Sequence, residues 1–148
     1  MKVTIYSRKE VEDLLQNDFP SNTAVISFYD PELRHIDSDY KPVDYSKKCN
    51  MVFQVALDDL DIDYLSERGY TYDTYFPEVN DLAKFIHKAF NSGMNIICQC
   101  EYGQSRSAGC ASAILEYFYK NGISVFIDYK RYPNQLVYHK VFDALENN

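Results

Sequence analysis

The sequence lacks tryptophan, has only three histidines and contains no long run of apolar residues. No stretch approaches the roughly 20 apolar residues that a membrane-spanning helix needs, and no N-terminal signal pattern is present. Basic residues are outnumbered too, because 15 Lys and Arg stand against 22 Asp and Glu, for a net charge of −7. This acidity argues against nucleic acid or an anionic membrane surface as a partner.

Metal and disulfide signals are also missing. His35, His87 and His139 show no spacing typical of metal ligands, and no metal- or nucleotide-binding motif is present, so we predict no cofactor. Four cysteines in a sequence without a signal indicate reduced thiols and not a disulfide framework. We therefore expect a cytoplasmic protein, and a monomer.

The length of 148 residues, without internal repeat, linker or low-complexity tract, predicts a single domain over residues 1–148. A chain of this length buries roughly two thirds of its unfolded surface, which suffices for a real core. Strand and helix patterns alternate along the sequence, which predicts a layered α/β fold. Strands are predicted at 2–6, 23–29, 50–57 and 94–98; helices after a Ser7-x-x-Glu10 capping box, at 77–90, at 107–120 and from Pro133-Asn134 onward; 123–127 is either a short strand or a helical turn.

The most informative stretch runs from Ile96 to Ala113, where a buried strand enters a short polar loop and then a helix of small residues. Cys100 opens the loop and Arg106 closes it, with five residues between them. A short loop at a helix N-terminus can direct several backbone N–H groups at one anion. Arg106 adds a planar fork that suits two phosphate oxygens. The loop is therefore predicted to bind phosphate.

Cys100 is the predicted nucleophile of this loop. The helix dipole and the loop N–H groups would favour its thiolate, which would sit below a bound phosphate, placed for in-line attack. Gly103 lets the backbone turn where a side chain would intrude. Ser107 is placed to donate a hydrogen bond to the sulfur, both as nucleophile and as leaving group.

This pattern resembles the signature of the protein-tyrosine-phosphatase superfamily. The fuller form Cys-x-x-Gly-x-Ser-Arg-Ser, from Cys100 to Ser107, resembles the dual-specificity branch and its small bacterial relatives. The resemblance extends over about residues 50–145 and implies a mixed, mostly parallel sheet of four to five strands flanked by helices. One position departs from the pattern: the family usually has a histidine before the cysteine, which helps to activate it, and this chain has Gln99.

A block of four carboxylates follows the predicted strand 50–57, at positions 58, 59, 61 and 63. Phosphate transfer needs a proton for the leaving oxygen, and an aspartate on a loop over the site can supply it. In the dual-specificity family the general acid follows a strand that ends in an apolar–acidic–Asp pattern, which Leu57-Asp58-Asp59 matches. We therefore predict Asp59 as the general acid, with Asp58 and Asp61 as alternatives. The distance in sequence from Asp59 to Cys100 is longer than usual, and 67–73 is interpreted as an extra loop.

The resemblance implies a metal-independent phosphomonoester hydrolase that works through a phosphocysteine intermediate. The substrate would be a phosphorylated protein or a small phosphomonoester, because a loop carboxylate on an acidic protein would repel a highly anionic substrate. Phosphotyrosine and phosphoserine or phosphothreonine both remain open. The predicted phosphate-binding residues are Glu101, Tyr102, Gly103, Gln104, Ser105 and Arg106.

Two other functions remain as alternatives. Gln99 is compatible with a phospho-ligand-binding relative that has weak or no turnover, and a rhodanese-type sulfurtransferase also uses a loop cysteine. The Arg-Ser ending of the loop and the upstream acidic block argue against the sulfurtransferase. Among the other thiols, Cys98 is interpreted as a buried apolar-like residue in preference to a redox group. Cys49 is a possible resolving thiol for Cys100.

Overall fold

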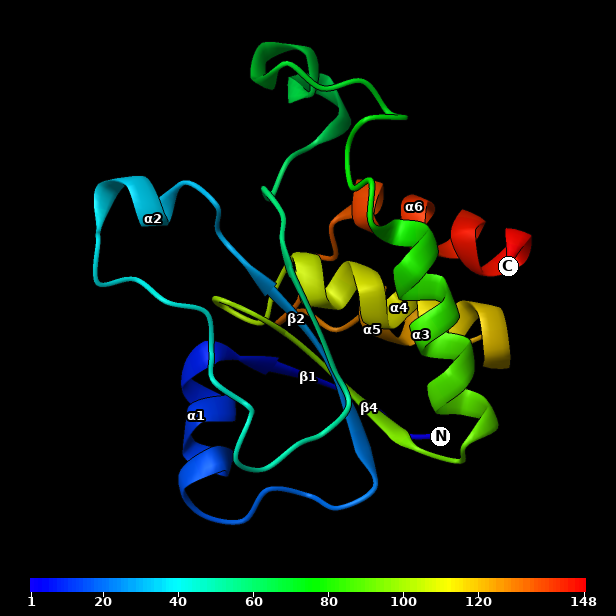
Figure 1. The fold of residues 1–148 in the computed structure, drawn as a ribbon. Coiled ribbons are helices and arrows are strands. Elements are labelled where there is room, and N and C mark those ends of the chain that lie inside the picture. The colour runs from blue at the N-terminus through cyan, green and yellow to red at the C-terminus, as the bar shows by residue number, and fades with distance from the viewer.

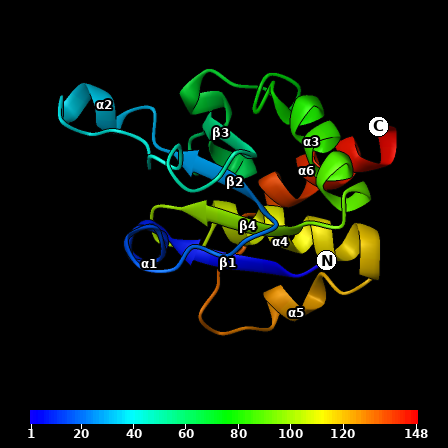
Figure 2. The ribbon, with the colours of Figure 1, turned by 60° about the horizontal axis from the view of Figure 1, so that its bottom comes forward.

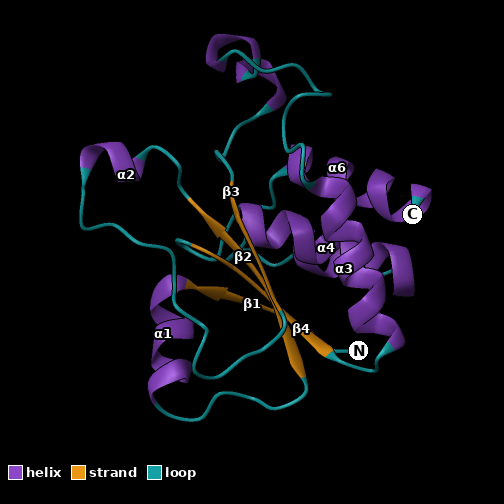
Figure 3. Ribbon diagram, viewed as in Figure 1, coloured by secondary structure: helices purple, strands orange, loops and turns teal.

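A four-stranded sheet, in which every pair of neighbouring strands is parallel, organises the molecule (Figure 1, Figure 3). The computed structural model describes residues 1–148, with the exception of the Arg34 side chain. The sheet order is β1-β4-β2-β3, so β4 lies between β1 and β2. The elements are β1 (Val3–Ser7), α1 (Arg8–Gln16), β2 (Thr23–Tyr29), α2 (Leu33–Ile36), β3 (Val52–Ala56), η1 (Ile62–Tyr64), η2 (Ser66–Arg68), α3 (Val79–Asn91), β4 (Asn95–Cys100), α4 (Arg106–Tyr119), α5 (Ile123–Phe126) and α6 (Gln135–Asn147).

The helices form a layer on each face of this sheet. Helix α1 packs on one face, against β1 and β4, and α4 packs on the other, against β1, β4 and β2. Helices α3 and α6 lie beside α4 on that second face, and α5 contacts α4 (Figure 1, Figure 2). The predicted single-domain α/β fold flanked by helices is confirmed. The number of strands is four, and all of them are parallel where a mixed sheet was expected.

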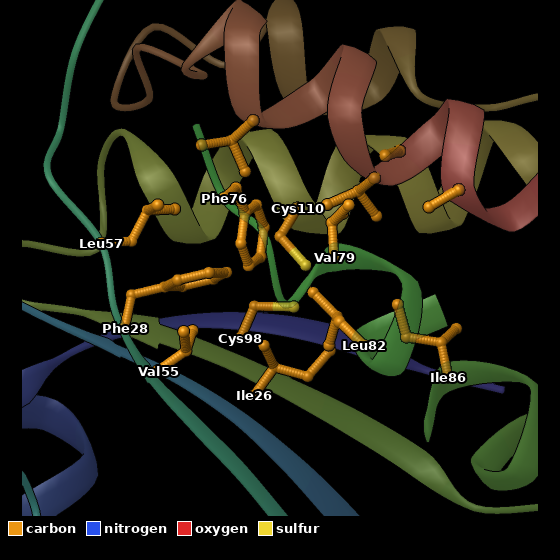
Figure 4. Packing of buried hydrophobic residues seen from close by; sticks show 14 of the residues in the cluster. Ile26, Phe28, Val55, Leu57, Phe76, Val79, Leu82, Ile86, Cys98 and Cys110 are labelled. Atoms are coloured by element: carbon orange, nitrogen blue, oxygen red, sulfur yellow. The ribbon is translucent and has the colours of Figure 1, made fainter. Parts of the chain in front are cut away.

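Alternation along β4 separates the two faces. Ile96, Cys98 and Cys100 point into the larger core beneath α3, α4 and α6, whereas Ile97 belongs to the smaller core beneath α1. Figure 4 shows the larger core, with Cys98 of β4 facing Cys110 of α4. Because successive side chains of a strand point to opposite faces, Cys100 and its neighbour Gln99 necessarily face different layers.

Local sequence signals set several of the helix ends. Ser7 and Glu10 form the predicted capping box at the start of α1, and the Asn134 side chain caps α6 by accepting from the N–H of Val137. The segment 123–127, predicted to be either a short strand or a helical turn, contains a short helix, Ile123–Phe126. No helix in the described part of the chain is long and apolar enough to cross a membrane.

Candidate active site

The loop predicted to bind phosphate joins the last residue of β4, Cys100, to the first residue of α4, Arg106. It lies at the carboxyl edge of the parallel sheet, where ligands of open α/β sheets bind. Ser7 pairs with Cys100 across the sheet, so the start of α1 lies directly behind the loop. Gly103 has φ +66°, and a Cβ there would lie 2.6 Å from the backbone nitrogen of Ser7. Glycine is required because the loop turns in the left-handed region while pressed against this backbone.

The carbonyl groups of the loop are held from outside. The N–H groups of Arg8, Tyr132 and Asn134 donate to carbonyls of the loop at 3.1, 2.8 and 3.0 Å, and the guanidinium of Arg131 donates to the Gly103 carbonyl. In a trans peptide the next N–H points opposite to the carbonyl, and the chain has no cis peptide. Because these carbonyls point outward, the N–H group that follows each of them points to the inner side of the loop. These N–H groups belong to Tyr102, Gln104, Ser105 and Arg106. Such a set of N–H groups is suited to an anion.

Cys100 lies at the floor of the loop and is 2 % exposed. Its sulfur is 3.0 Å from the hydroxyl oxygen of Ser107, which is fully buried in the first turn of α4. Of the other residues predicted to bind phosphate, Tyr102 is 77 % exposed and Gln104 is exposed as well, so both face solvent. The structure thus brings Cys100 and Ser107 into contact, as the motif predicts.

Arg106 is buried beside Cys100 and is only partly satisfied. Its Nη1 donates to the Asp30 carboxylate at 2.6 Å and to the Leu57 carbonyl at 2.7 Å. Burial by itself would lower the pKa of Arg106, but the hydrogen bond and charge of Asp30 outweigh it, with smaller contributions from Cys100 and Asp59, and the pKa is raised. Its Nε is buried and has no hydrogen-bond partner among the residues that the structure describes. A buried unpaired donor costs free energy. Here the donor belongs to Arg106, the cation that the sequence predicts to bind phosphate.

Asp59 is the carboxylate of the acidic block that reaches the loop. Its Oδ1 accepts a hydrogen bond from the Ser105 hydroxyl at 2.7 Å and another from the Asn134 side-chain amide at 2.7 Å. Asn134 also donates to the Leu60 carbonyl at 3.0 Å and is held close to α4, where a Cβ on Gly109 would lie 2.4 Å from the Asn134 carbonyl. Asp59 is therefore anchored both to the loop and to the start of α6.

The two alternative candidates for the acid have other partners. Asp58 accepts a hydrogen bond from the Tyr70 hydroxyl at 3.3 Å, and its carbonyl accepts from the Tyr75 hydroxyl at 2.6 Å. Asp61 accepts from the backbone N–H of Asp63 and begins the helix η1. The segment interpreted as an extra loop thus supplies Tyr70, which holds the side chain of Asp58 away from the loop hydrogen bonds of Asp59.

Gln99, in place of the family's histidine, is buried on the opposite face from Cys100. Its carbonyl oxygen accepts from the Ser27 hydroxyl at 2.6 Å and from the Tyr45 hydroxyl at 2.7 Å. The Gln54 amide in turn donates to Ser27 at 3.2 Å. This network braces β4 against β2 immediately before the loop, and Gln99 fixes the strand through neutral hydrogen bonds.

The remaining thiols lie away from the loop. Cys49 donates to the carbonyls of Thr23 and Met51, at the amino end of β2, so it lies at the opposite edge of the sheet from Cys100. This placement does not support Cys49 as a resolving thiol. A hydrogen bond with Cys110, together with burial, raises the pKa of the Cys98 thiol. Cys98 is thus a protonated core residue (Figure 4).

Sequence reasoning missed two residues that hold the site. Asp30, which binds Arg106, directly follows β2, and this strand lies beside β4 in the sheet. The strand order, once known, would have placed a carboxylate after β2 next to the loop. Arg131, which holds the Gly103 carbonyl, lies in an irregular segment between α5 and α6, and no local pattern points to it. Within the described side chains, no cluster of three or more His, Cys, Asp or Glu is arranged to hold a metal ion.

Comparison with known proteins gives matches of fold but not of sequence. No family model and no curated protein matches the chain. Among solved structures, human DUSP28 aligns with a TM-score of 0.57 at 10 % identity, covering 98 % of this chain and 92 % of that one. Tk-PTP in its active form aligns with a TM-score of 0.56 at 11 % identity, covering 100 % and 94 %.

A third solved structure, PTPMT1 in complex with PI(5)P, aligns with a TM-score of 0.51 at 13 % identity, covering 99 % of this chain and 91 % of that one. All three neighbours have the architecture of the tyrosine and dual-specificity phosphatases. The alignments extend over nearly the whole of each chain, so the similarity is not confined to the loop. This chain therefore has the dual-specificity and tyrosine phosphatase fold.

Proposed function

We propose that this chain is a cysteine-dependent phosphomonoester hydrolase that acts on phosphorylated proteins through a phosphocysteine intermediate. The observation that carries the proposal is the buried Nε of Arg106, which has no hydrogen-bond partner within the described part of the chain. The guanidinium lies close enough to Cys100 for the two charges to interact. A phosphate oxygen in the loop would supply the missing acceptor, and the directed N–H groups would bind the other oxygens. The fold of the chain supports the same activity.

In the first step the Cys100 thiolate attacks phosphorus and the bond from phosphorus to the leaving oxygen breaks. Arg106 and the loop N–H groups stabilise the charge on the three equatorial oxygens. Asp59, in its protonated form, transfers its proton to the leaving oxygen. Both hydrogen bonds to Asp59 end on Oδ1, so Oδ2 is the oxygen suited to carry that proton.

In the second step water attacks the phosphocysteine and the sulfur–phosphorus bond breaks. The Asp59 carboxylate now takes the proton from water, and inorganic phosphate leaves. The Ser107 hydroxyl, 3.0 Å from the sulfur, donates a hydrogen bond to the departing thiolate. The chain returns to its starting state, with Cys100 and Asp59 each used in both steps.

The loop favours a singly phosphorylated group over a polyanion. Glu101 contributes a carboxylate, and Tyr102 and Gln104 are uncharged. Arg131, the cation nearest in the adjoining segment, is bound to the Gly103 carbonyl. Arg8, whose charge acts on Glu101, is paired with Glu12. Extra phosphates would therefore meet no basic side chain of the loop other than Arg106.

The decisive test replaces Cys100 by serine. We expect Cys100→Ser to reduce hydrolysis of p-nitrophenyl phosphate by about 10³-fold or more, while tungstate binding, measured by calorimetry, persists. Cys49→Ser is the matched control, because Cys49 is a buried thiol at the far edge of the sheet, and it should keep its activity. Wild-type rates in the Cys100→Ser variant would show the mechanism to be wrong.

A binding module without turnover is the second candidate. The ion pair between Arg106 and Asp30, and Gln99 in place of histidine, are the features that favour it. Tight tungstate binding by the wild type, with no hydrolysis of aryl phosphate over a broad pH range, would support this function in place of the first. Thiocyanate formation from thiosulfate and cyanide is the parallel assay for the sulfurtransferase alternative.

A further inference from the structure

A cavity of about 500 Å³ opens beside the loop and is not used by the chemistry described above. It shares Asp59 and Ser105 with the active site and extends from them toward α6. Its size lies in the range of sites that bind small ligands or single side chains. A group next to a phosphate bound in the loop would therefore be close enough to enter this cavity.

The walls of this cavity combine apolar surface with negative charge. Ile62 and Tyr132 line it and are 61 % and 72 % exposed, so they present apolar surface to whatever enters. Tyr72 forms a rigid wall, because its hydroxyl donates to Asp143 at 3.0 Å and the Lys140 ammonium lies 4.7 Å from its ring centre. Among the described side chains, no lysine or arginine lines the cavity.

Asp61 is the carboxylate of the cavity that the proposed chemistry leaves free. Asp59, the other one, is bound to Ser105 and Asn134 and serves the leaving group. Asp61 accepts one backbone hydrogen bond, from Asp63, and has no cationic partner among the described side chains. Among the described side chains that line the cavity, His139 alone has a titratable nitrogen. The cavity thus offers an exposed carboxylate in the same wall as the apolar side chains.

We propose that this cavity, hereafter the flanking pocket, receives a lysine or arginine side chain adjacent to the phosphorylated residue of a protein substrate. The proposal rests on the proposed function, since it assumes that the phosphate occupies the loop. The methylene stem of the basic residue would pack on Ile62 and Tyr132, and its charged end would pair with Asp61. A small cationic phosphomonoester would pair with Asp61 but would leave the apolar surface of Ile62 and Tyr132 uncovered.

The test compares three phosphotyrosyl peptides that differ only in the residues on both sides of the phosphotyrosine: arginine, norleucine or glutamate. The quantity is the ratio of kcat/KM for the arginine peptide to that for the norleucine peptide, which cancels any general loss of activity. The same ratio of affinities is measured by calorimetry in Cys100→Ser, which does not depend on turnover. We expect a ratio of about three to ten at low salt, falling as salt rises.

Asp61→Asn should bring the ratio close to one, because asparagine keeps the hydrogen bond from Asp63 but loses the charge. Asp63→Asn makes the same change in net charge only two residues away, at a side chain that does not line the flanking pocket, and should leave the ratio intact. A wild-type ratio near one, or an equal fall in both variants, would overturn the proposal.

Two further results distinguish this proposal from a pocket for a small cationic phosphate and from a failure of the proposed function itself. A preference for phosphocholine over 3,3-dimethylbutyl phosphate, its analogue without the positive charge, with no preference among the peptides, would assign the pocket to a small cationic phosphomonoester and overturn the peptide proposal. Absence of hydrolysis with all substrates would contradict the proposed function. The ratio of peptide affinities in Cys100→Ser would then still decide whether the flanking pocket selects a basic side chain.

Discussion

Two adjacent carboxylates, Asp58 and Asp59, follow β3 and have different partners. Tyr70 and Tyr75 bind the Asp58 side chain and carbonyl, whereas Ser105 and Asn134 hold Asp59. The role of general acid requires contact with the leaving group bound over the loop. Position therefore favours Asp59, and the two residues provide a matched pair for a test.

Asp59→Asn should keep both hydrogen bonds, because the amide oxygen can replace Oδ1, but it removes the transferable proton. We expect kcat on phosphotyrosyl peptide to fall by about 10²–10⁴-fold, with a smaller fall on p-nitrophenyl phosphate, whose leaving group needs less protonation. Asp58→Asn should change either rate by less than about threefold. The measurement is steady-state kinetics on both substrates. Equal losses in the two variants, or a loss that ignores the leaving group, would exclude Asp59 as the acid.

The residues that could be predicted from the sequence are those whose spacing alone fixes their position. Cys100, Gly103 and Arg106 lie within a single turn between strand and helix, so local geometry places them together. Asp30 is 76 residues from Arg106 in the sequence, and only the strand order β1-β4-β2-β3 brings it near. Arg131 depends on the path of an irregular segment. Long-range partners of this kind carry no local signal.

At the scale of elements, the loop depends on the junction between β1 and α1. Ser7 ends β1, caps α1 and lies against Gly103. The N–H of Arg8, in the first turn of α1, donates to the carbonyl of Glu101. The first two elements of the chain therefore form the back wall of a loop that lies about a hundred positions later.

Gly103→Ala tests this wall. The new Cβ would lie 2.6 Å from the Ser7 nitrogen and 2.8 Å from the Tyr6 carbonyl carbon, so the loop must move. We expect loss of tungstate binding and at least about a hundredfold loss of kcat/KM, since a displacement of 1 Å at an active site can cost that much. Both are measured against the wild type under identical conditions.

Gly93→Ala is the control for Gly103→Ala. Gly93 has φ +68°, close to that of Gly103, but a Cβ there meets nothing within 4 Å. It should lower the free energy of unfolding by about 1–2 kcal/mol and leave tungstate binding unchanged. Retained binding in Gly103→Ala would show that contact with the wall does not shape the loop, whereas an equal loss in both variants would show that backbone strain decides the outcome.

The elements themselves could largely be predicted because their periodicity is a local property. The capping box at Ser7 and the apolar stripe of α3 each lie within one turn or one helix. The segment Ile123–Phe126 could not be assigned, since four residues give too short a period to distinguish strand from helix. The wholly parallel sheet depends on the crossovers between strands, which no single segment specifies.

At the scale of the whole molecule, phenol and thiol groups that are wholly or partly buried make the fold sensitive to alkali. Burial raises the pKa of Tyr45 and of Tyr75, and burial with the Asp143 hydrogen bond raises the pKa of Tyr72 to about 12. Burial raises the pKa of the Cys49 thiol, and a hydrogen bond with Cys110, together with burial, raises that of Cys98. In each case the native state holds a proton that the unfolded chain releases at lower pH.

The free energy of unfolding should therefore fall as pH rises above about 9. A group whose pKa is raised on folding contributes stability that is complete below the unfolded pKa, near 8.5 for Cys and 10 for Tyr, and is lost as pH climbs toward the folded value. For Tyr72 that window runs from about 10 to about 12. Urea unfolding followed by circular dichroism at steps of pH measures the slope. Tyr72→Phe should make the slope shallower between those limits, whereas Tyr129→Phe, at an 83 % exposed position, should leave it unchanged. A stability that stays level or rises through this range, or an identical slope in Tyr72→Phe, would mean that these protons are not retained by the folded state.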